Sequence, residues 1–499
     1  MCVGEERISK IKGTVAFVFY NDRMRTFIPL NISYLSAALR GGGYDVKVFD
    51  TSFYVEHERL LEEKKKEDAG VFQAVDYGAV GVSPKESSML DDLVLFVEVE
   101  RPIMIAFSAF SQSIDDSIGI ARKLKGRFPG LPVVFGGIHV NIDPYGVLND
   151  GCVDYICLGE GEEAIVELAD AVRTCGDISR VKNIGYKIRG EIKINKCREP
   201  SSMDLLPRPD WSPFEDCHIY GPYRGKLLKM ALVEYSRTCP YHCAYCGNDV
   251  MRGQYKDSGF RLRYRFKSPE KFVNELLYFK DMYGIEFVNI VDGTFLAQNE
   301  KNLEELSALY AEKIALPFFC DATVHCITAK KVEMLRRMGC VCVNMGIECS
   351  NDEYRRKYLG RRMSNDKIID SFRMVADYGI ETRSYNIIGM PYQTRNDIMD
   401  TIELNRACGV GSVSLSIFMP YEGTALRELC VKEGLIRGDE RVSGDGTIPM
   451  IKNPYLSDKE LLGLYNVFSM YVKADKSYWP EIHRAESDEG LRRELLSRI

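Results

Sequence analysis

Continuous apolar runs alternate with helix-spaced apolar residues along the first part of the chain. The run 14–20 (TVAFVFY) predicts a buried strand. Residues 29–50 begin at a proline, continue with helical spacing, reach three glycines and end in a second strand. Two more strands are predicted at 103–110 and 131–137, on either side of a helix around 117–125. This alternation predicts an α/β domain with a doubly wound, Rossmann-like parallel sheet over residues 11–190.

A second alternation begins after a segment that is rich in proline and serine. Residues 191–228 show no clear period, so we expect an ordered linker there. Helical stretches then separate six predicted strands, at 230–237, 286–293, 317–325, 340–348, 382–389 and 412–419. Six strand–helix units predict a partial (βα)6 barrel of the TIM type over 229–435, with its chemistry at the carboxyl ends of the strands. The remainder, 436–499, has helical period with aromatic residues and is predicted to pack on the barrel.

Composition narrows the class of protein. A chain of 499 residues with 45% hydrophobic residues has material for about three domains. A net charge of -6 without a long basic block argues against a nucleic-acid partner. There is no apolar run after Met1 and none long enough to span a membrane, so we expect neither a signal peptide nor a transmembrane helix. Sixteen cysteines in such a chain then predict reduced thiols in the cytoplasm, some of them metal ligands.

Three cysteines cluster directly after the first predicted barrel strand. Cys239, Cys243 and Cys246 lie in the stretch TCPYHCAYCG, so one metal centre can take all three. Zinc would need a fourth ligand, and His242 is awkward because it adjoins Cys243. A cubane iron–sulfur cluster fits better, because three thiolates hold three irons and leave the fourth open. Structural zinc and metal-free reduced thiols are the alternatives.

The Cys-x3-Cys-x2-Cys spacing, with Tyr245 before the last cysteine, resembles the radical S-adenosylmethionine enzymes. The resemblance implies a [4Fe–4S] cluster on Cys239, Cys243 and Cys246 whose open iron chelates S-adenosylmethionine. One electron from the cluster would cleave the sulfonium to a 5'-deoxyadenosyl radical, so the cofactors carry the radical chemistry. The same resemblance implies an external electron donor such as flavodoxin or ferredoxin.

Two further segments resemble the parts of this family that meet S-adenosylmethionine. VDGTF (291–295) resembles the segment that faces the methionine amino group, with Asp292 in the polar position. MGIECSND (345–352) resembles a Gly-x-Glu-Ser-Gly segment that faces the cosubstrate. Cys349 replaces the serine there, so the resemblance assigns only Glu348.

The last two predicted strands carry matching segments. YNIIGMPYQT (385–394), which contains Asn386, resembles the motif whose backbone lies against adenine. FMPYEGTALRE (418–428) resembles a Pro-Tyr-Pro-Gly-Thr segment, with Glu422 in place of the second proline. These segments follow the cysteines in the order that the family has.

The first domain resembles the cobalamin-binding domain that precedes the radical barrel in one branch of the family. The matching segments include FSAFSQS, FGGIHVNIDPYGVLNDGCVDYICLGEGEEAI and the linker sequence LPRPDW. A ligand of a doubly wound sheet lies beyond the carboxyl ends of its strands. The predicted cobalamin contacts are therefore Asn21, Arg23, Ser108, Ser111, Gly136, Gly137, His139, Gly159, Glu160 and Glu162.

Two details of this resemblance bear on cobalamin. Gly136 and Gly137 could let the backbone approach a flat macrocycle, although turn geometry alone explains them equally well. The loop after the first strand, YNDRMRTF, lacks the histidine that ligates cobalt from below in many such domains. We expect His139 to contact the corrin edge, and the absence of a lower histidine would favour low-valent cobalt.

Together the resemblances cover about residues 14–432 and imply a cobalamin-dependent radical S-adenosylmethionine methyltransferase. One S-adenosylmethionine would methylate cob(I)alamin. A second would give the radical that takes hydrogen from an unactivated carbon of a small-molecule or peptide substrate, which then captures the methyl group. The same architecture also serves cyclases, ring-rearranging enzymes and oxidative enzymes. A non-catalytic, zinc-bridged binding protein is an alternative from a different class.

Replacing Cys239, Cys243 and Cys246 together by alanine should remove the iron–sulfur absorbance and abolish S-adenosylmethionine cleavage. Three thiolates are the minimum that holds a cubane. Iron content and the visible spectrum after anaerobic reconstitution measure the loss, and Cys320→Ala is the control. A triple variant that still binds about four irons per chain would show that other cysteines hold the cluster.

Overall fold

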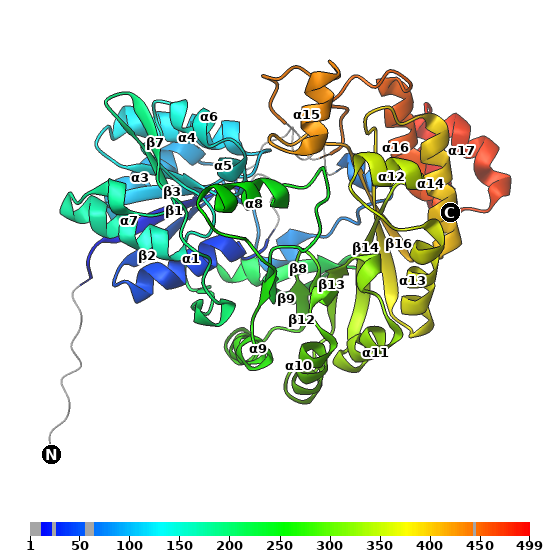
Figure 1. Ribbon diagram of the computed structural model, residues 1–499, viewed down its shortest axis with the longest axis horizontal. Helices are drawn as coiled ribbons and strands as arrows, with labels where there is room; N and C mark the ends of the chain where they lie inside the picture. Colours follow the sequence, from blue (N-terminus) through cyan, green and yellow to red (C-terminus); the bar gives the residue numbers. More distant parts are fainter. Residues whose placement is uncertain (1–10, 22–25, 55–63, 443–445) are drawn as a thin grey trace.

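Two seven-stranded sheets lie side by side in the computed structural model, which describes residues 11–21, 26–54, 64–442 and 446–499 (Figure 1). Arg23, one of the predicted cobalamin contacts, lies outside the described residues. Among the described helices, none combines the length and the apolar character needed to cross a lipid bilayer.

The first sheet confirms the doubly wound prediction. Its strand order is β2-β1-β3-β4-β5-β6-β7; β1 to β5 pair in parallel, and an antiparallel hairpin closes one edge. The strands are β1 (Thr14–Phe19), β2 (Asp45–Asp50), β3 (Met104–Ser108), β4 (Val133–Gly136), β5 (Tyr155–Cys157), β6 (Ile184–Ile188) and β7 (Glu191–Ile194). The helices are α1 (Leu30–Gly41), α3 (Met89–Glu100), α4 (Ile114–Arg127), α5 (Ile138–Ile142), α6 (Pro144–Asn149) and α7 (Glu162–Thr174).

Both faces of this sheet are buried, which explains why its strands read as continuous apolar runs. Val15 and Phe17 of β1 belong to the core under α1 and α7. Ala16 and Val18, on the opposite face, belong to the core under α3 and α4. Side chains alternate between the faces of a strand, so a strand covered on both sides has no polar face to show.

The second sheet confirms the six predicted barrel strands. Its order is β16-β15-β14-β13-β12-β9-β8, with β8 antiparallel at the edge and the other six parallel. The strands are β8 (Tyr220–Tyr223), β9 (Lys226–Val233), β12 (Phe287–Ile290), β13 (Phe318–Ala322), β14 (Cys340–Glu348), β15 (Glu381–Ile388) and β16 (Ser412–Ile417). The sheet is curled and open, because β16 and β8 are its two edges.

Helices cover the outer face of the curled sheet. Those helices are α9 (Pro269–Tyr283), α10 (Glu300–Lys313), α11 (Ala329–Met338), α13 (Asn365–Asp377) and α14 (Arg395–Cys408). Of the other three helices, α8 (Asn248–Asp257) packs on α5 of the first domain, and α12 (Asp352–Tyr358) and α15 (Ala425–Lys432) follow β14 and β16. Local signals fix their ends: α9 starts at the Ser268 cap with Pro269 in its first turn and stops at Gly284, which has a φ of 65°. Figure 1 shows α9, α10 and α11 outside the strands.

The C-terminal region packs on the barrel, as predicted. It contains α16 (Asp458–Lys473), α17 (Trp479–Ala485) and α18 (Glu489–Arg498). Leu464 and Phe468 of α16 share a core with Ile402 of α14 and Val413 of β16. A capping box of Ser457 and Glu460 starts α16, so local and tertiary signals agree at this helix.

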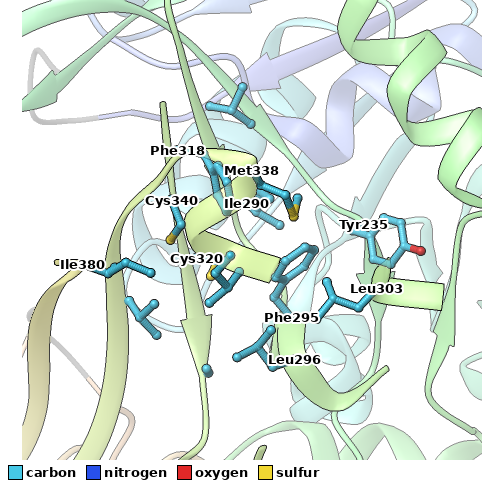
Figure 2. Close-up of a cluster of buried hydrophobic side chains, with 14 of the residues drawn as sticks. Tyr235, Ile290, Phe295, Leu296, Leu303, Phe318, Cys320, Met338, Cys340 and Ile380 are labelled. Carbon is cyan, nitrogen blue, oxygen red and sulfur yellow. The ribbon is translucent and has the colours of Figure 1, made fainter. Parts of the chain in front are cut away.

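The cysteines outside the loop 238–247 serve mainly as core residues. Cys320 and Cys340 lie among the buried apolar side chains between the second sheet and its helices (Figure 2). Burial raises the pKa of Cys342 to about 11. Reduced, buried thiols of this kind pack as small apolar groups.

Candidate functional site

The loop that carries the three clustered cysteines follows β10 (Ser236–Arg237), which pairs with β11 (Arg265–Phe266). Thr238, the residue before Cys239, has a φ of 71°, so the chain turns sharply there. At Ala244 the amide donates to the Leu359 carbonyl (3.1 Å) and the carbonyl accepts from the Leu426 amide (2.9 Å). The loop is therefore held by the segments that follow β14 and β16.

The donor set of this loop fits an iron–sulfur cluster. All three cysteines are half-buried free thiols. Burial raises the pKa of Cys243, and the Arg361 guanidinium opposes that rise. His242, the alternative zinc ligand, is 68% exposed, and its Nδ1 lies 2.8 Å from Asp249 Oδ1. In the described part of the chain, no group of three His, Cys, Asp or Glu side chains is arranged to hold a single metal ion. A cubane takes one thiolate on each of three separate irons, which suits three thiols on one loop.

Tyr245, Glu348 and Arg361 form a buried polar cluster beside Cys243. The Tyr245 hydroxyl donates to Glu348 Oε1 at 3.0 Å, and Arg361 Nη1 lies 3.4 Å from the same oxygen. Arg361 Nη1 also lies 3.9 Å from Cys243 Sγ, and its Nη2 donates to the Gly346 carbonyl at 2.8 Å. Burial raises the pKa of Glu348, while Arg361 and the Tyr245 hydroxyl oppose that rise. The structure thus brings one predicted residue, Glu348 at the end of β14, to another, Tyr245 of the cysteine loop.

Arg361 is a site residue that sequence reasoning missed. Arg361 belongs to the basic run 355–362, and a run of charges is usually a solvated surface, but two members of this run are buried. Arg355 is fully buried and donates to the Met363 carbonyl (2.9 Å) and to Asn365 Oδ1 (2.8 Å). The Arg361 side chain is only 10% exposed. A run of like charges carries no periodic signal that separates its buried members from its exposed ones.

Asp292 braces the strand end that leads into the cysteine loop. Its Oδ1 accepts from the amides of Tyr235 (2.8 Å) and Ser236 (3.0 Å), and its Oδ2 accepts from the Ser236 hydroxyl (2.6 Å). Burial raises the pKa of Asp292 to about 7 against these hydrogen bonds. Both carboxylate oxygens are engaged with the chain, which is the geometry of a positioning residue. A direct contact with S-adenosylmethionine stays a prediction.

The Asn386 side chain is bonded toward α14 instead of the interior of the barrel. Its Nδ2 donates to Ser384 Oγ (2.9 Å), and its Oδ1 accepts from Asn405 Nδ2 on α14 (2.8 Å). Neighbouring side chains of a strand alternate between its faces, so Tyr385 and Ile387 take the other face. A contact of this segment with adenine would therefore come from its backbone or from Tyr385 and Ile387.

Three of the nine described non-glycine residues with a left-handed backbone conformation lie near the cysteine loop or beyond the carboxyl ends of barrel strands. Thr238 (71°) follows β10, Glu348 (64°) ends β14, and Tyr392 (60°) follows β15. Such conformations are rare outside glycine, and they concentrate at functional sites where the surrounding structure holds them. Three of them at one end of the barrel support the placement of the site there.

A cavity of about 560 Å³ opens between the two sheets. Its wall includes six of the predicted cobalamin contacts: Ser108, Gly136, Gly137, Gly159, Glu160 and Glu162. The barrel contributes Thr238 and Asn248, on either side of the cysteine loop, and Gly293 after β12. Phe110 and Val291 of the wall are 57% and 41% exposed, so the cavity presents apolar surface that a corrin could cover.

Asn21, Ser111 and His139 are buried and do not belong to the residues that line this cavity. The side-chain Nδ2 of Asn21 donates to Ser52 Oγ at 2.7 Å, and the backbone amide of Asn21 donates to Thr51 Oγ1 at 2.8 Å. His139 Nδ1 lies 3.0 Å from Ser111 Oγ. Burial lowers the pKa of His139, so a neutral imidazole is favoured. These residues support the loops that meet the cavity, and their contact with cobalamin stays a prediction.

The structure separates the roles of the two adjacent glycines. Gly137 has a φ of 96°, and a Cβ there would lie 2.6 Å from the Ala109 carbonyl oxygen, so backbone geometry alone requires glycine. At Gly136 the nearest atoms to a Cβ belong to Cys157, at 3.9 Å. Gly136 therefore has room for a side chain, and its lack of one keeps the cavity wall open.

Arg237 of β10 links the barrel part of the chain to the first domain at the wall of the cavity, a role that no pattern in the sequence indicates. Its Nε bonds Glu234 at the end of β9 (2.7 Å), and its Nη2 bonds Glu162 of the first domain (2.6 Å). Arg237 Nη1 lies 3.4 Å from Glu160, which also pairs with Arg265. The Glu160 and Glu162 carboxylates thus belong to the cavity wall while they are paired with Arg237 of β10 and Arg265 of β11.

Comparisons with known proteins identify both domains. The Radical SAM superfamily matches residues 233–404, and the B12 binding domain matches residues 69–169. An uncharacterized methyltransferase of Pyrococcus horikoshii is 23% identical over 70% of this chain and 74% of its own length. An anaerobic magnesium-protoporphyrin IX monomethyl ester cyclase of Synechocystis is 27% identical over 52% of this chain and 50% of its own length.

Solved structures share the fold of the whole chain. The cobalamin-dependent S-adenosylmethionine radical enzyme OxsB superposes on 97% of this chain and 70% of its own, with a TM-score of 0.68 at 15% identity. The radical S-adenosylmethionine methyltransferase TsrM of Kitasatospora setae covers 97% of this chain and 99% of its own, with a TM-score of 0.60 at 14% identity. At these identities the likeness shows the shared fold, a doubly wound domain followed by a partial barrel.

Glu348→Ala should weaken S-adenosylmethionine binding by about tenfold or more, since a charge-assisted hydrogen bond contributes roughly 1.5–3 kcal/mol. Equilibrium dialysis on the reconstituted protein measures the affinity, and iron content checks the cluster. Glu353→Ala, on the exposed side of α12, is the control. Glu348→Ala should also have a lower melting temperature, because Arg361 loses its buried partner. An earlier melt with unchanged affinity would make Glu348 purely structural.

Gly136→Leu should lower the cobalamin content of the purified protein without changing its iron content. The added side chain has room on the backbone and enters the cavity wall. Gly119→Leu on α4 is the matched control, because a Cβ there meets nothing within 4 Å and Gly119 does not line the cavity. Cobalt and iron analysis of the folded variants decides the outcome. If Gly136→Leu kept its full cobalamin content, the corrin would not bind beside β4.

Proposed function

The chain belongs to the radical S-adenosylmethionine enzymes that carry a cobalamin-binding domain, and on that premise we propose that it is a methyltransferase acting on an unactivated carbon. Family membership assigns a [4Fe–4S] cluster, S-adenosylmethionine and cobalamin. These groups supply the radical and the transferable methyl group when bound. The chain's own residues hold, orient and enclose them.

The shared cavity is the observation that carries the proposal. Residues of the cobalamin-type loops and residues adjoining the cysteine loop form one wall: Gly136 and Glu160 on one side, Thr238 and Gly293 on the other. Carbon methylation by these cofactors needs both within reach of one substrate atom. An arrangement in which the two domains face a common space supports that reaction.

Each assigned residue has a distinct task in this proposal. Cys239, Cys243 and Cys246 hold the cluster, and Glu348 binds a polar group of S-adenosylmethionine. Asp292 fixes the strand end that leads into the cysteine loop, and Arg361 stabilises the Glu348 carboxylate. Ser108, Gly136 and Glu160 shape the cobalamin side of the cavity. The substrate is a small molecule or peptide that reaches the cavity between the sheets, and the enzyme works in the reducing cytoplasm.

A radical cyclase is the second candidate, and the similarity to the magnesium-protoporphyrin cyclase favours it. That similarity covers half of each chain, whereas the Pyrococcus methyltransferase aligns over about three quarters of its own length. Similarity over both domains therefore favours methyl transfer.

A substrate-free assay separates the two candidates. A methyltransferase that loads its cobalamin from S-adenosylmethionine should form about one equivalent of S-adenosylhomocysteine per bound cobalamin under strongly reducing conditions. Liquid chromatography with mass spectrometry quantifies S-adenosylhomocysteine and 5'-deoxyadenosine after anaerobic incubation. Protein reconstituted without cobalamin is the control. Formation of 5'-deoxyadenosine alone by the cobalamin-loaded protein would reject the methyltransferase in favour of another radical reaction.

A further inference from the structure

The cysteine loop reaches the molecular surface at His242 and Gly360. Both residues are exposed, and a Cβ on Gly360 would lie only 2.7 Å from the His242 carbonyl oxygen. Leu359 bonds the amide of Ala244, and Arg361 contacts Cys243 Sγ. The segment 359–361 thus connects the outer surface directly with the residues that hold the metal centre.

Cationic side chains flank this point. Arg356 and Lys357 on α12 and Arg362 after it are exposed, and none of the described residues forms an ion pair with them in this structure. The Arg361 amide donates to the Arg355 carbonyl at 3.0 Å, which folds Arg362 back beside α12. We define Arg356, Lys357 and Arg362 as the basic patch.

Of the acidic side chains near the patch, Asp352 and Asp249 are engaged by the chain itself, and Glu353 on α12 is exposed beside Lys357. Asp352 bonds the buried Arg355, and Asp249 pairs with His242 and Arg252. The patch therefore keeps a positive surface on a chain whose net charge is -6. An acidic partner would be repelled by most of this protein and attracted here.

We propose that the basic patch is the docking surface for an acidic one-electron carrier protein that reduces the centre held by Cys239, Cys243 and Cys246. The inference rests on the proposed function, which requires an electron from outside the chain. In the step, the carrier is oxidised by one electron and the cysteine-held centre is reduced by one; no atom is transferred. The patch flanks Gly360, which lies against the His242 backbone, so a carrier docked there lies next to the cysteine loop.

Charge reversal tests this proposal. The variant Arg356→Glu, Lys357→Glu and Arg362→Glu should weaken binding of purified flavodoxin by at least about tenfold, because like charges then face each other. The matched control reverses Lys226, Lys313 and Arg336, three exposed cations at the opposite end of the barrel strands, with the same change in net charge. Calorimetry or biolayer interferometry gives the affinity, and added salt should weaken binding to the wild type and the control alike.

Reduction kinetics supply a second readout. Reduced flavodoxin should bleach the iron–sulfur absorbance of the patch variant more slowly than that of the wild type, whereas dithionite should reduce both equally. Equal flavodoxin affinity of wild type and patch variant, or an equal loss in the control, overturns the docking surface. A wild type that does not bind flavodoxin overturns it as well. A chain that binds flavodoxin at the patch but forms no S-adenosylhomocysteine would contradict the proposed function and leave the docking surface in place.

Discussion

The ion-pair hub at Arg237 fixes how the two sheets face each other. Its guanidinium bonds Glu234, which directly follows β9, and Glu162 of the first domain, and it lies 5.0 Å from the Tyr34 ring centre. Burial works to lower the pKa of Arg237, but Glu234, Glu162 and Glu160 together raise it well above its usual value. Removing one partner of such a buried pair costs about 3–5 kcal/mol, because the other charge is left uncompensated. The hub therefore keeps both sets of strand ends on one cavity.

A second buried contact strengthens the same interface between the first domain and the barrel part of the chain, which we call the seam. Lys267, fully buried, donates to the Tyr34 hydroxyl at 2.8 Å and pairs with Glu275 on α9. An exposed ion pair also links the domains, because Arg441 Nη1 lies 2.6 Å from Asp115 Oδ1 of the first domain. Ion pairs and hydrogen bonds between two domains specify their relative orientation more sharply than apolar contacts do, because a charge that shifts loses its partner. The common cavity depends on that single orientation.

Within the barrel, buried charges are likewise held in fixed positions beside the cysteine loop. Glu348 is held in a left-handed conformation between Tyr245 and Arg361, beside the half-buried thiol of Cys243. A buried carboxylate with a fixed partner needs little reorganisation when a ligand arrives. The chain maintains this strained arrangement because the bulge in β14 and the Gly346 carbonyl hold Arg361 in place.

Both folds and the clustering of three cysteines on one loop could be predicted from the sequence. Strands that are buried on both faces appear in the sequence as apolar runs, and helix caps are formed by residues close together in the chain. Cys239, Cys243 and Cys246 lie within eight consecutive residues. Short-range patterns therefore carry this information. Only the tertiary structure decided that Arg361 reaches Cys243, that Asn386 turns to α14, and that Arg237 binds across the seam. It also decided that Gly137 serves backbone geometry while Gly136 has room beside the cavity. Each of these facts depends on residues far apart in the chain, and pairing across such distances leaves no periodic trace in a single sequence.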